Sequence, residues 1–435
     1  MKQFLWQDGS DQVDQHIMEF MAGEDVILDR DLFPYDIRAT AAHVRGLERI
    51  GMLSPAESET LCNLLGQLQQ AFSEGSFVLD QRFEDGHSAI EMFLTEKAGD
   101  IGAKVHAGRS RNDQVAVATR LYLKDSLESL ASLDCRIARA CLARAEQHAN
   151  VPMPGYTHLQ RAVPSSIGLW MGGFAEAFTD NLFFAAAVRE LIDCSPLGTA
   201  AGYGVNLPLD RDGVAAELGF SRIQVNPMAA QNSRGKFEIM ALQAAAHAMQ
   251  DVRRLAWDLS LFTTSEFDFV KLPSSFTTGS SIMPNKSNPD VVELLRGKGA
   301  TIEGAIVEVQ SILSLPSGYQ RDLQLTKAPL LRGIKAALQA LSIVPSLVQG
   351  MEFNEDQMRR AISADMFATD IALAETVKGV PFRAAYLEAK KSLDRAGAPD
   401  AASSLAQRVS PGACGDLQLD RIKRRLEQKM KEIEG

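Results

Sequence analysis

The amino-acid sequence predicts an all-α protein built around a central bundle of long helices. Residues 109–151 include neither glycine nor proline, and their apolar side chains recur every three or four positions, which places them on one helical face. Alternation of apolar and polar residues with a period of two is almost absent, so strands and an α/β fold are disfavoured. Because one long helix exposes a long apolar stripe, we expect helices of similar length to cover it.

The N-terminal segment, residues 1–108, is expected to form a small helical domain. Its apolar segments are short, and Gly51, Gly75 and Gly86 lie between them at positions that suit turns. The C-terminal segment, residues 358–435, is expected to form a second small helical domain. It is predicted to end in a charged helix that covers "DRIKRRLEQKMKEIEG".

The central segment, residues 109–357, is predicted to form the long-helix bundle. Pro164 suits the start of the second long helix, because the first turn of a helix does not need the N–H that proline lacks. Pro345 is expected to kink or end the last long helix. The four helices that follow the first are predicted at residues 165–194, 236–267, 291–315 and 327–351.

Composition and charge exclude several classes of protein. The 435 residues carry a net charge of −10, which disfavours non-specific binding to nucleic acid but leaves room for an anionic small molecule in a cleft with local cations. The N-terminus, "MKQFLWQDGSDQ", lacks a signal-peptide pattern, and no apolar run is expected to span a membrane, so a cytoplasmic protein is predicted. The five cysteines show no CxxC spacing and are interpreted as free thiols. No motif for a metal or a cofactor is present in the sequence.

Four polar stretches interrupt the helical pattern, at residues 106–114, 155–164, 278–290 and 316–327. Arg109 and Arg111 lie just before the first long helix, where cations are unfavourable against the helix dipole. They are interpreted as an anion-binding corner, because guanidinium groups match carboxylates in two-point contacts. The third stretch, "TGSSIMPNKSNPD", could be a linker. Its prolines restrict the backbone, however, and a flexible linker does not need such restriction. His158 alone is more often a structural histidine than a catalytic one.

These stretches carry a family resemblance. "GSSIMPNKSNP", at residues 279–289, resembles the signature of the fumarase/aspartase superfamily. "HAGRSRNDQV", "GYTHLQRAVP", "PLGTAAGYG" and "YQRDLQLTK" are similar to segments of the argininosuccinate lyase family. The resemblance implies a three-domain all-α subunit and a homotetramer whose long helices form a twenty-helix core. It further implies active sites that each take residues from three subunits, and a reaction that needs no cofactor.

The resemblance also implies roles for individual residues. Ser280 matches the general base, and His158 matches an acid or relay residue with Glu293 as its acidic partner. Lys286 and Asn288 match residues that stabilise the reacting carboxylate. The residues that match substrate contacts are Ser110, Arg111, Asn112, Thr157, Tyr319, Gln324 and Lys327, together with a substrate-site histidine, His87.

The reaction that the family catalyses suits these residue types. Cleavage of argininosuccinate to arginine and fumarate is a β-elimination, in which proton removal next to a carboxylate creates a second negative charge. Donors placed in advance where that charge develops lower the barrier. A loop with exposed N–H groups and one lysine supplies such donors.

Several positions depart from the family pattern and leave two alternatives open. Asp25 stands where a serine is usual, and Gly235–Lys236 and Leu325–Thr326 replace other charged or polar residues of the pattern. These changes are expected to affect the amine end of the substrate. The alternatives are a lyase that releases fumarate from another N-substituted aspartate, and a structural protein of this family without catalytic activity.

Overall fold

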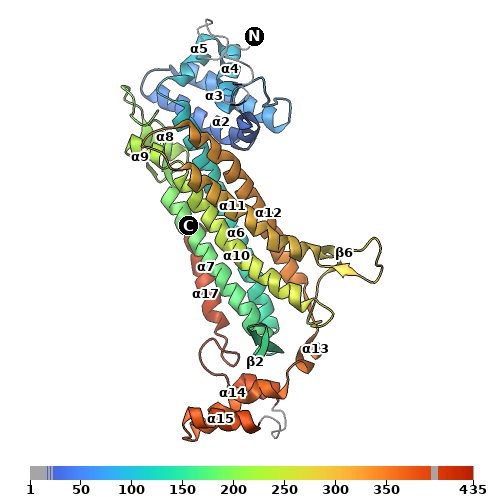
Figure 1. Cartoon of the computed structure of the whole chain (residues 1–435). Helices are drawn as coiled ribbons and strands as arrows, with labels where there is room; N and C mark the ends of the chain where they lie inside the picture. The colour runs from blue at the N-terminus through green and yellow to red at the C-terminus, as the bar shows by residue number, and fades with distance from the viewer. Residues whose placement is uncertain (1–16, 18–19, 21–22, 393–399, 435) are drawn as a thin grey trace. The chain divides into compact units, whose positions relative to one another are not determined.

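The computed structural model describes residues 17, 20, 23–392 and 400–434, and this part of the chain is mostly helical (Figure 1). It divides into two compact units. Unit 1 comprises Met1–Glu128, Ala187–Ala244 and Thr301–Lys335, and unit 2 comprises Ser129–Ala186, Ala245–Ala300 and Ala336–Gly435.

The five long helices confirm the helical periodicity of the sequence, and the second begins later than predicted. Pro164 does not start a helix but lies in a β-strand, so the helix begins three residues further on. The last long helix continues through Pro345 and ends five residues later. The five are α6 (Arg111–Gln147), α7 (Ile167–Ile192), α10 (Lys236–Phe262), α11 (Asp290–Ile312) and α12 (Lys327–Gly350).

The shorter elements of unit 1 include four helices near its N-terminus, drawn in blue in Figure 1. Gly51 and Gly75 follow the first two of them at φ +78° and +75°, a conformation that favours glycine. Gly86, predicted as a turn, is instead the first residue of a helix. The elements are α2 (Asp25–Arg49), α3 (Pro55–Ser73), α4 (Gly86–Ala98), α5 (Asp100–Ala103), η1 (Lys104–His106), β3 (Cys194–Ser195), α8 (Arg211–Glu217), β4 (Arg222–Ile223), α9 (Pro227–Asn232) and η3 (Arg321–Thr326).

Close helix packing shapes the core of unit 1. Gly333 of α12 faces α10 and α11, and a Cβ atom there would lie 2.6 Å from Leu242 and 3.1 Å from Ala305. Real Cβ atoms do not approach other atoms as closely as the first of these distances, so the absent side chain lets the three helices pack tightly. Arg120 of α6 stacks on the ring of Phe237 of α10 at 4.2 Å. These contacts fix the ends of the helices from which polar side chains project.

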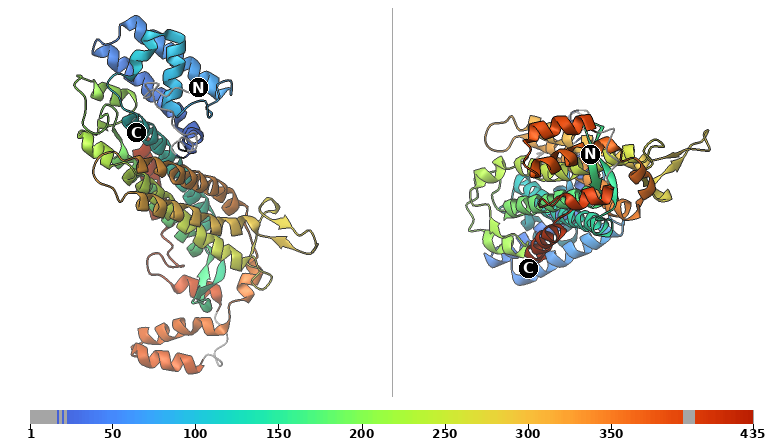
Figure 2. Two further views of the ribbon diagram at one scale, coloured as in Figure 1. Left: turned by 45° about the horizontal axis from the view of Figure 1, so that its top comes forward. Right: turned by 90° about the horizontal axis from the view of Figure 1, so that it is seen from below.

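Unit 2 holds small hairpins and short helices around its helical core. The β1–β2 hairpin packs against α13, η4 and α16. The short β6–β7 hairpin connects α10 to α11 and projects away from them in the views of Figures 1 and 2. The elements are β1 (Pro152–Thr157), β2 (Gln160–Ser166), β5 (Val270–Lys271), η2 (Ser274–Phe276), β6 (Thr278–Gly279), β7 (Ser287–Asn288), β8 (Glu352–Phe353), α13 (Glu355–Arg360), η4 (Ala364–Phe367), α14 (Ala368–Val377), α15 (Phe382–Ser392), α16 (Ala401–Gln407) and the predicted charged helix α17 (Leu419–Glu434).

The β1–β2 hairpin was not predicted from the sequence. Its strands are antiparallel, with Pro154 opposite Pro164 and a register shift between Pro154 and Tyr156. Proline removes a helical N–H and pushes the residue before it into an extended conformation, so these prolines favour strands over helix. The short strands and their irregular register hide the period-two pattern that normally reveals a strand.

One helical stretch of the described residues meets a length and composition criterion for a membrane span. The stretch Arg321–Gly350 is long and apolar enough by length and composition to cross a membrane. Its most apolar window is 61% buried inside the structure, as is usual for a core helix. The signal-peptide prediction concerns residues outside the described part. All five cysteines are free thiols, and four of them are buried.

An unpaired carboxyl group lies in the core of unit 2. Asp134 of α6 is fully buried, and neither of its carboxyl oxygens has a hydrogen-bond partner within the described residues. Burial, and then the nearby Asp251, raise the pKa of Asp134 well above its usual value. Asp251 is itself held by Asn181 of α7 at 2.8 Å. Asp134 therefore opposes folding at any pH at which the unfolded chain would ionise it.

We expect Asp134→Asn to raise the free energy of unfolding at pH 7 by about 1–3 kcal/mol. The native pKa is raised, so the cost of Asp134 is absent below the pKa of the unfolded state and grows as the pH rises above it. Urea unfolding of both proteins at several pH values measures this difference. A gain that is as large at pH 4 as at pH 7 would show that ionisation is not the cause. Asp251→Asn, which removes the neighbouring charge, is the matched control and should give a smaller gain.

Candidate active site

The predicted site residues fall into two groups, one in each unit. Arg111, Asn112, Tyr319, Gln324 and Lys327 line one cavity of about 210 Å³ in unit 1. In the sequence these five residues lie in two stretches more than 200 positions apart, and the fold of unit 1 brings them together. The other residues on the wall of this cavity are Asp25, Glu84, Asp85, Val115, Arg234 and Arg321.

Lys327 is the most buried cation of this cavity. Its side chain is 4% exposed, and Nζ lies 2.6 Å from Asp25 Oδ1 and 2.5 Å from Asp29 Oδ1. Burial disfavours the charged ammonium, but the carboxylates of Asp29 and Asp25 outweigh it and raise the pKa of Lys327 above its usual value. Lys327 is therefore a fixed positive charge at neutral pH. Burial in turn raises the pKa of Asp25.

Arg111 starts α6 and is compensated by acids from the segment before α4. Its guanidinium lies 2.9 Å from Glu84 and 3.4 Å from Asp85. These carboxylates offset the unfavourable position of a cation at a helix N-terminus. The Ser110 hydroxyl accepts the N–H of Asn112 at 3.3 Å, so it satisfies a free donor of the first turn.

Arg109 and His87 lie away from the cavity wall. Arg109 is buried and donates to the Thr40 hydroxyl at 2.9 Å. His87 is buried with Nδ1 2.5 Å from Asp36 Oδ2. Burial lowers the pKa of His87, but Asp36 and further acids outweigh it and raise this pKa to about 9. His87 is therefore charged at neutral pH.

In unit 2, His158 lies at the tip of the β1–β2 hairpin. Thr157 and Gln160 pair across the strands, so His158 and Leu159 form a two-residue turn, with φ values of +54° and +58°. Two positive φ angles are typical of a type I′ turn, where Asn and Gly are the favoured residues. A bulky leucine in this conformation is strained, and such strain is frequent at functional sites. The tip presents the His158 ring at an exposed position.

Ser280 and Lys286 lie in the loop between β6 and β7. The pairs Thr278–Asn288 and Gly279–Ser287 close this loop. The Ser280 hydroxyl oxygen accepts the N–H groups of Ile282 and Met283 at 3.3 and 3.0 Å. Glu293 follows in the first turn of α11 and is exposed. The sequence predicted a loop with a restricted backbone, and the structure has a hairpin whose loop is closed by a turn at Ser280.

Within the described residues, no hydrogen bond or ion pair connects His158 to Ser280, Lys286 or Glu293. The two hairpins that carry them lie apart in both Figure 1 and Figure 2. Unit 2 of one chain therefore does not bring His158 into contact with Ser280, Lys286 or Glu293.

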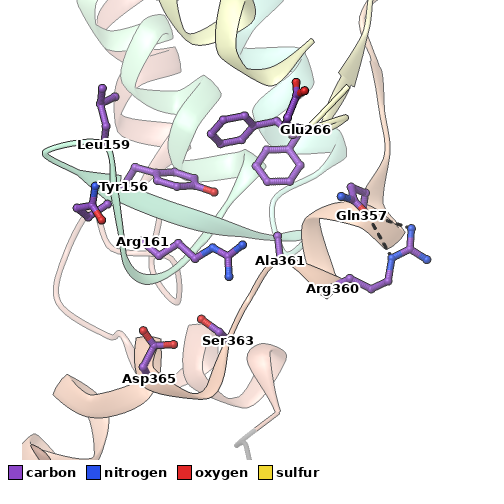
Figure 3. Close-up of a pocket in the computed structure, with 12 residues that line it drawn as sticks. Tyr156, Leu159, Arg161, Glu266, Gln357, Arg360, Ala361, Ser363 and Asp365 are labelled. Atoms are coloured by element: carbon purple, nitrogen blue, oxygen red, sulfur yellow. Dashed lines mark hydrogen bonds between the residues drawn. The ribbon is translucent and has the colours of Figure 1, made fainter. Parts of the chain in front are cut away.

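A second and wider cavity of about 880 Å³ lies beside the β1–β2 hairpin. Figure 3 shows Arg161 pointing into it, with Ser363 and Asp365 across the space. Arg360 on its wall is hydrogen-bonded to Gln357 at 3.2 Å. Arg161, Arg360 and Asp365 are exposed, so this cavity is an open surface hollow. The polar stretch at residues 155–164 contributes Tyr156, Leu159, Gln160 and Arg161 to this cavity, but the other lining residues come from segments without a recognisable motif, so the cavity was not predicted.

Two buried acids were not predicted from the sequence. Asp29 holds Lys327 of the unit 1 cavity, and Asp36 pairs with His87 away from the cavity wall. Asp25 and Asp29 are four residues apart, so they lie on the same face of α2. In the sequence, the one indication of a buried charge pair was this spacing of two acids on a helical face that is otherwise largely apolar.

Comparisons with known proteins give matches over most of the chain. A family model described as lyase matches residues 10–304. The chain is 54% identical over 423 residues to a protein named argininosuccinate lyase from Xanthomonas oryzae pv. oryzae (strain PXO99A), covering 97% of this chain and 98% of that protein. It is also 54% identical over 428 residues to a protein of the same name from Stenotrophomonas maltophilia (strain K279a), covering 98% and 99%.

Solved structures share the fold. A variant of EDDS lyase with bound fumarate gives a TM-score of 0.78 at 23% identity, covering 98% of this chain and 91% of that one. The 3-carboxy-cis,cis-muconate lactonizing enzyme from Pseudomonas putida gives 0.73 at 17% identity, covering 96% and 97%. At these identities the likeness concerns the fold. The relatives that are 54% identical and the matched family model show that the chain belongs to the argininosuccinate lyase family of the fumarase/aspartase superfamily.

Proposed function

We propose that this chain catalyses the reversible β-elimination of argininosuccinate to arginine and fumarate. The observation that carries the proposal is 54% identity to proteins of that name over nearly the whole chain. In arginine biosynthesis this carbon–nitrogen lyase step releases arginine, and it requires no cofactor.

In the proposed mechanism, Ser280 removes the proton next to the reacting carboxylate. A serine hydroxyl is a weak base, and it serves this role only where its alkoxide is stabilised. The N–H groups of Ile282 and Met283 point at Ser280 Oγ, and Lys286 brings a positive charge into the same loop. These donors support the assignment.

Lys286 and Asn288 are proposed to meet the charge that develops on the aci-carboxylate, because donors placed there stabilise the transition state most. His158, with Glu293, is proposed to donate the proton to the leaving nitrogen or to relay it. The exposed position of His158 at a strained turn supports a role outside the core.

The cavity of unit 1 is proposed to hold the substrate through Arg111, Asn112, Tyr319, Gln324 and Lys327. Its paired positive and negative side chains suit a ligand that carries both charges. Ser110, Thr157 and His87 complete the proposed substrate-binding set.

The assay is the rise of fumarate absorbance when purified protein receives argininosuccinate, compared with other N-substituted aspartates at equal concentration. We expect fumarate from argininosuccinate and at least about a hundredfold lower kcat/KM with the other compounds. Fumarate from another aspartate adduct alone would replace the proposed substrate. No fumarate from any of them would favour a structural protein.

We further propose a cytoplasmic homotetramer of three-domain subunits, with domain boundaries at 108/109 and 357/358. Exposed apolar side chains on the long helices, including Leu169, Trp257 and Leu294, support association through these helices. Active sites that take residues from three subunits would account for the absence of contacts between His158 and Ser280. Light scattering that gives the mass of one subunit would contradict the tetramer.

A further inference from the structure

Asp29 lies behind the wall of the unit 1 cavity, in contact with Lys327, and no proposed role accounts for it. It is 4% exposed and lies on α2, behind Asp25. Its Oδ1 is 2.5 Å from the ammonium of Lys327, and its Oδ2 accepts the N–H of Gly86 at 2.8 Å. One carboxylate therefore holds two segments that are far apart in the sequence.

The contact with Gly86 fixes the start of α4. The first N–H groups of a helix have no partner within the helix, so an outside acceptor stabilises them. A Cβ atom at position 86 would lie 3.2 Å from Phe33 and 3.5 Å from the carboxylate of Asp29, so the backbone approaches α2 closely. The start of α4 is therefore set directly against Asp29.

The start of α4 in turn positions a charged pair of the cavity. Asp85 is the N-cap residue of α4, and its side chain accepts the N–H of Ser88 at 2.7 Å. The other oxygen of Asp85 faces Arg111 at 3.4 Å. Asp29 thus contacts Lys327 directly and reaches Arg111 through Gly86 and Asp85.

We infer that Asp29 is a positioning residue for substrate binding, which holds Lys327 and the Asp85–Arg111 pair in the geometry that the ligand requires. This inference rests on the proposed function, because it assigns to Asp29 the orientation of residues proposed to bind argininosuccinate. Both groups that face Asp29 are donors, and both oxygens of its carboxylate are used. A single acceptor cannot replace it.

The test is Asp29→Asn. The amide has the shape of the carboxylate, but its NH₂ must face either Lys327 or Gly86, and neither can accept a hydrogen bond. We expect kcat/KM for argininosuccinate to fall about a hundredfold, chiefly through a higher KM, because small displacements of binding groups have effects of this size.

The matched control is Asp31→Asn. Asp31 lies two residues further along α2 and pairs with Lys335 of α12, but this pair is exposed. Exposed ion pairs contribute little, so kcat/KM should stay within about twofold of wild type. The same chemical change on the same two helices thus separates the buried pair from a surface pair.

A double-mutant cycle with Lys327→Met separates positioning from general loosening of unit 1. If Asp29 acts mainly through Lys327, Asp29→Asn should change kcat/KM by less than about tenfold once Lys327 is absent. If the hundredfold loss persists in that background, the inference that Asp29 positions Lys327 is wrong. Asp29→Glu keeps both acceptors and is the second variant should Asp29→Asn not fold. It should retain more activity than Asp29→Asn or Asp29→Ala, and a lower activity than Asp29→Ala would overturn the inference.

Failure of the inference and failure of the proposed function give different results. If the wild-type protein forms no fumarate from argininosuccinate, the proposed function fails. If wild type is active and Asp29→Asn keeps the wild-type KM and kcat, only the role of Asp29 fails.

Discussion

Replacement of Ser280 by alanine is expected to lower kcat for argininosuccinate cleavage at least about 10³-fold, because removal of a proton-transfer group leaves only binding and electrostatic contributions. The hydroxyl oxygen accepts two backbone N–H groups of its own loop, and alanine deletes that acceptor. Because Ser280 lies in an exposed hairpin loop, the change should leave the helical core and the melting temperature unaltered.

Stopped-flow or steady-state fumarate absorbance measures kcat, and circular dichroism checks the fold. Ser281→Ala is the matched control, since this neighbouring serine is exposed in the same loop. This variant should retain kcat within a few-fold of wild type, which corresponds to a change of at most about 1 kcal/mol in the activation free energy. Near-wild-type turnover in Ser280→Ala, with a large loss in Ser281→Ala, would move the base to Ser281.

The second large effect is expected for His158→Asn, with kcat reduced about 10²–10⁴-fold and KM changed much less. Asparagine is the informative substitution because His158 has φ +54°. Asparagine adopts this backbone conformation more readily than other residues with a side chain, so the turn is preserved and only the imidazole is removed.

The adjacent turn position provides the control for His158. Leu159 has φ +58° and is 74% exposed, so Leu159→Asn relieves backbone strain without removing a titratable group. Its kcat should remain close to wild type. If His158→Asn keeps full activity while Leu159→Asn loses it, the conformation of the hairpin rather than the imidazole would be the functional feature.

The helical part of the fold could be predicted from the sequence because long periodic segments carry a strong local signal. The helix from Arg111 to Gln147 follows directly from a run without glycine or proline. The hairpin that holds His158 could not be predicted this way, because Pro154 and Pro164 break the helical pattern without leaving a clear strand pattern.

The candidate site could be predicted only as far as sequence motifs reach. The polar stretches identified Lys327 and Arg111, but not the acids that neutralise them. Asp29 and Lys327 are 298 positions apart, and no local pattern indicates that they meet. Burial of charge is decided by tertiary packing, so the partners of these cations become visible only in the folded chain.

The division of the proposed residues between the two units has a consequence for evolution and engineering. The loop that carries Ser280 and Lys286 belongs to unit 2, whereas the cavity with Asp25 and Lys327 belongs to unit 1. Mutations in the cavity thus leave intact the sequence and the local turn of the loop that carries Ser280 and Lys286. A combinatorial library restricted to the wall of that cavity could be screened for new amine donors in the reverse direction, with consumption of fumarate as one readout common to every variant.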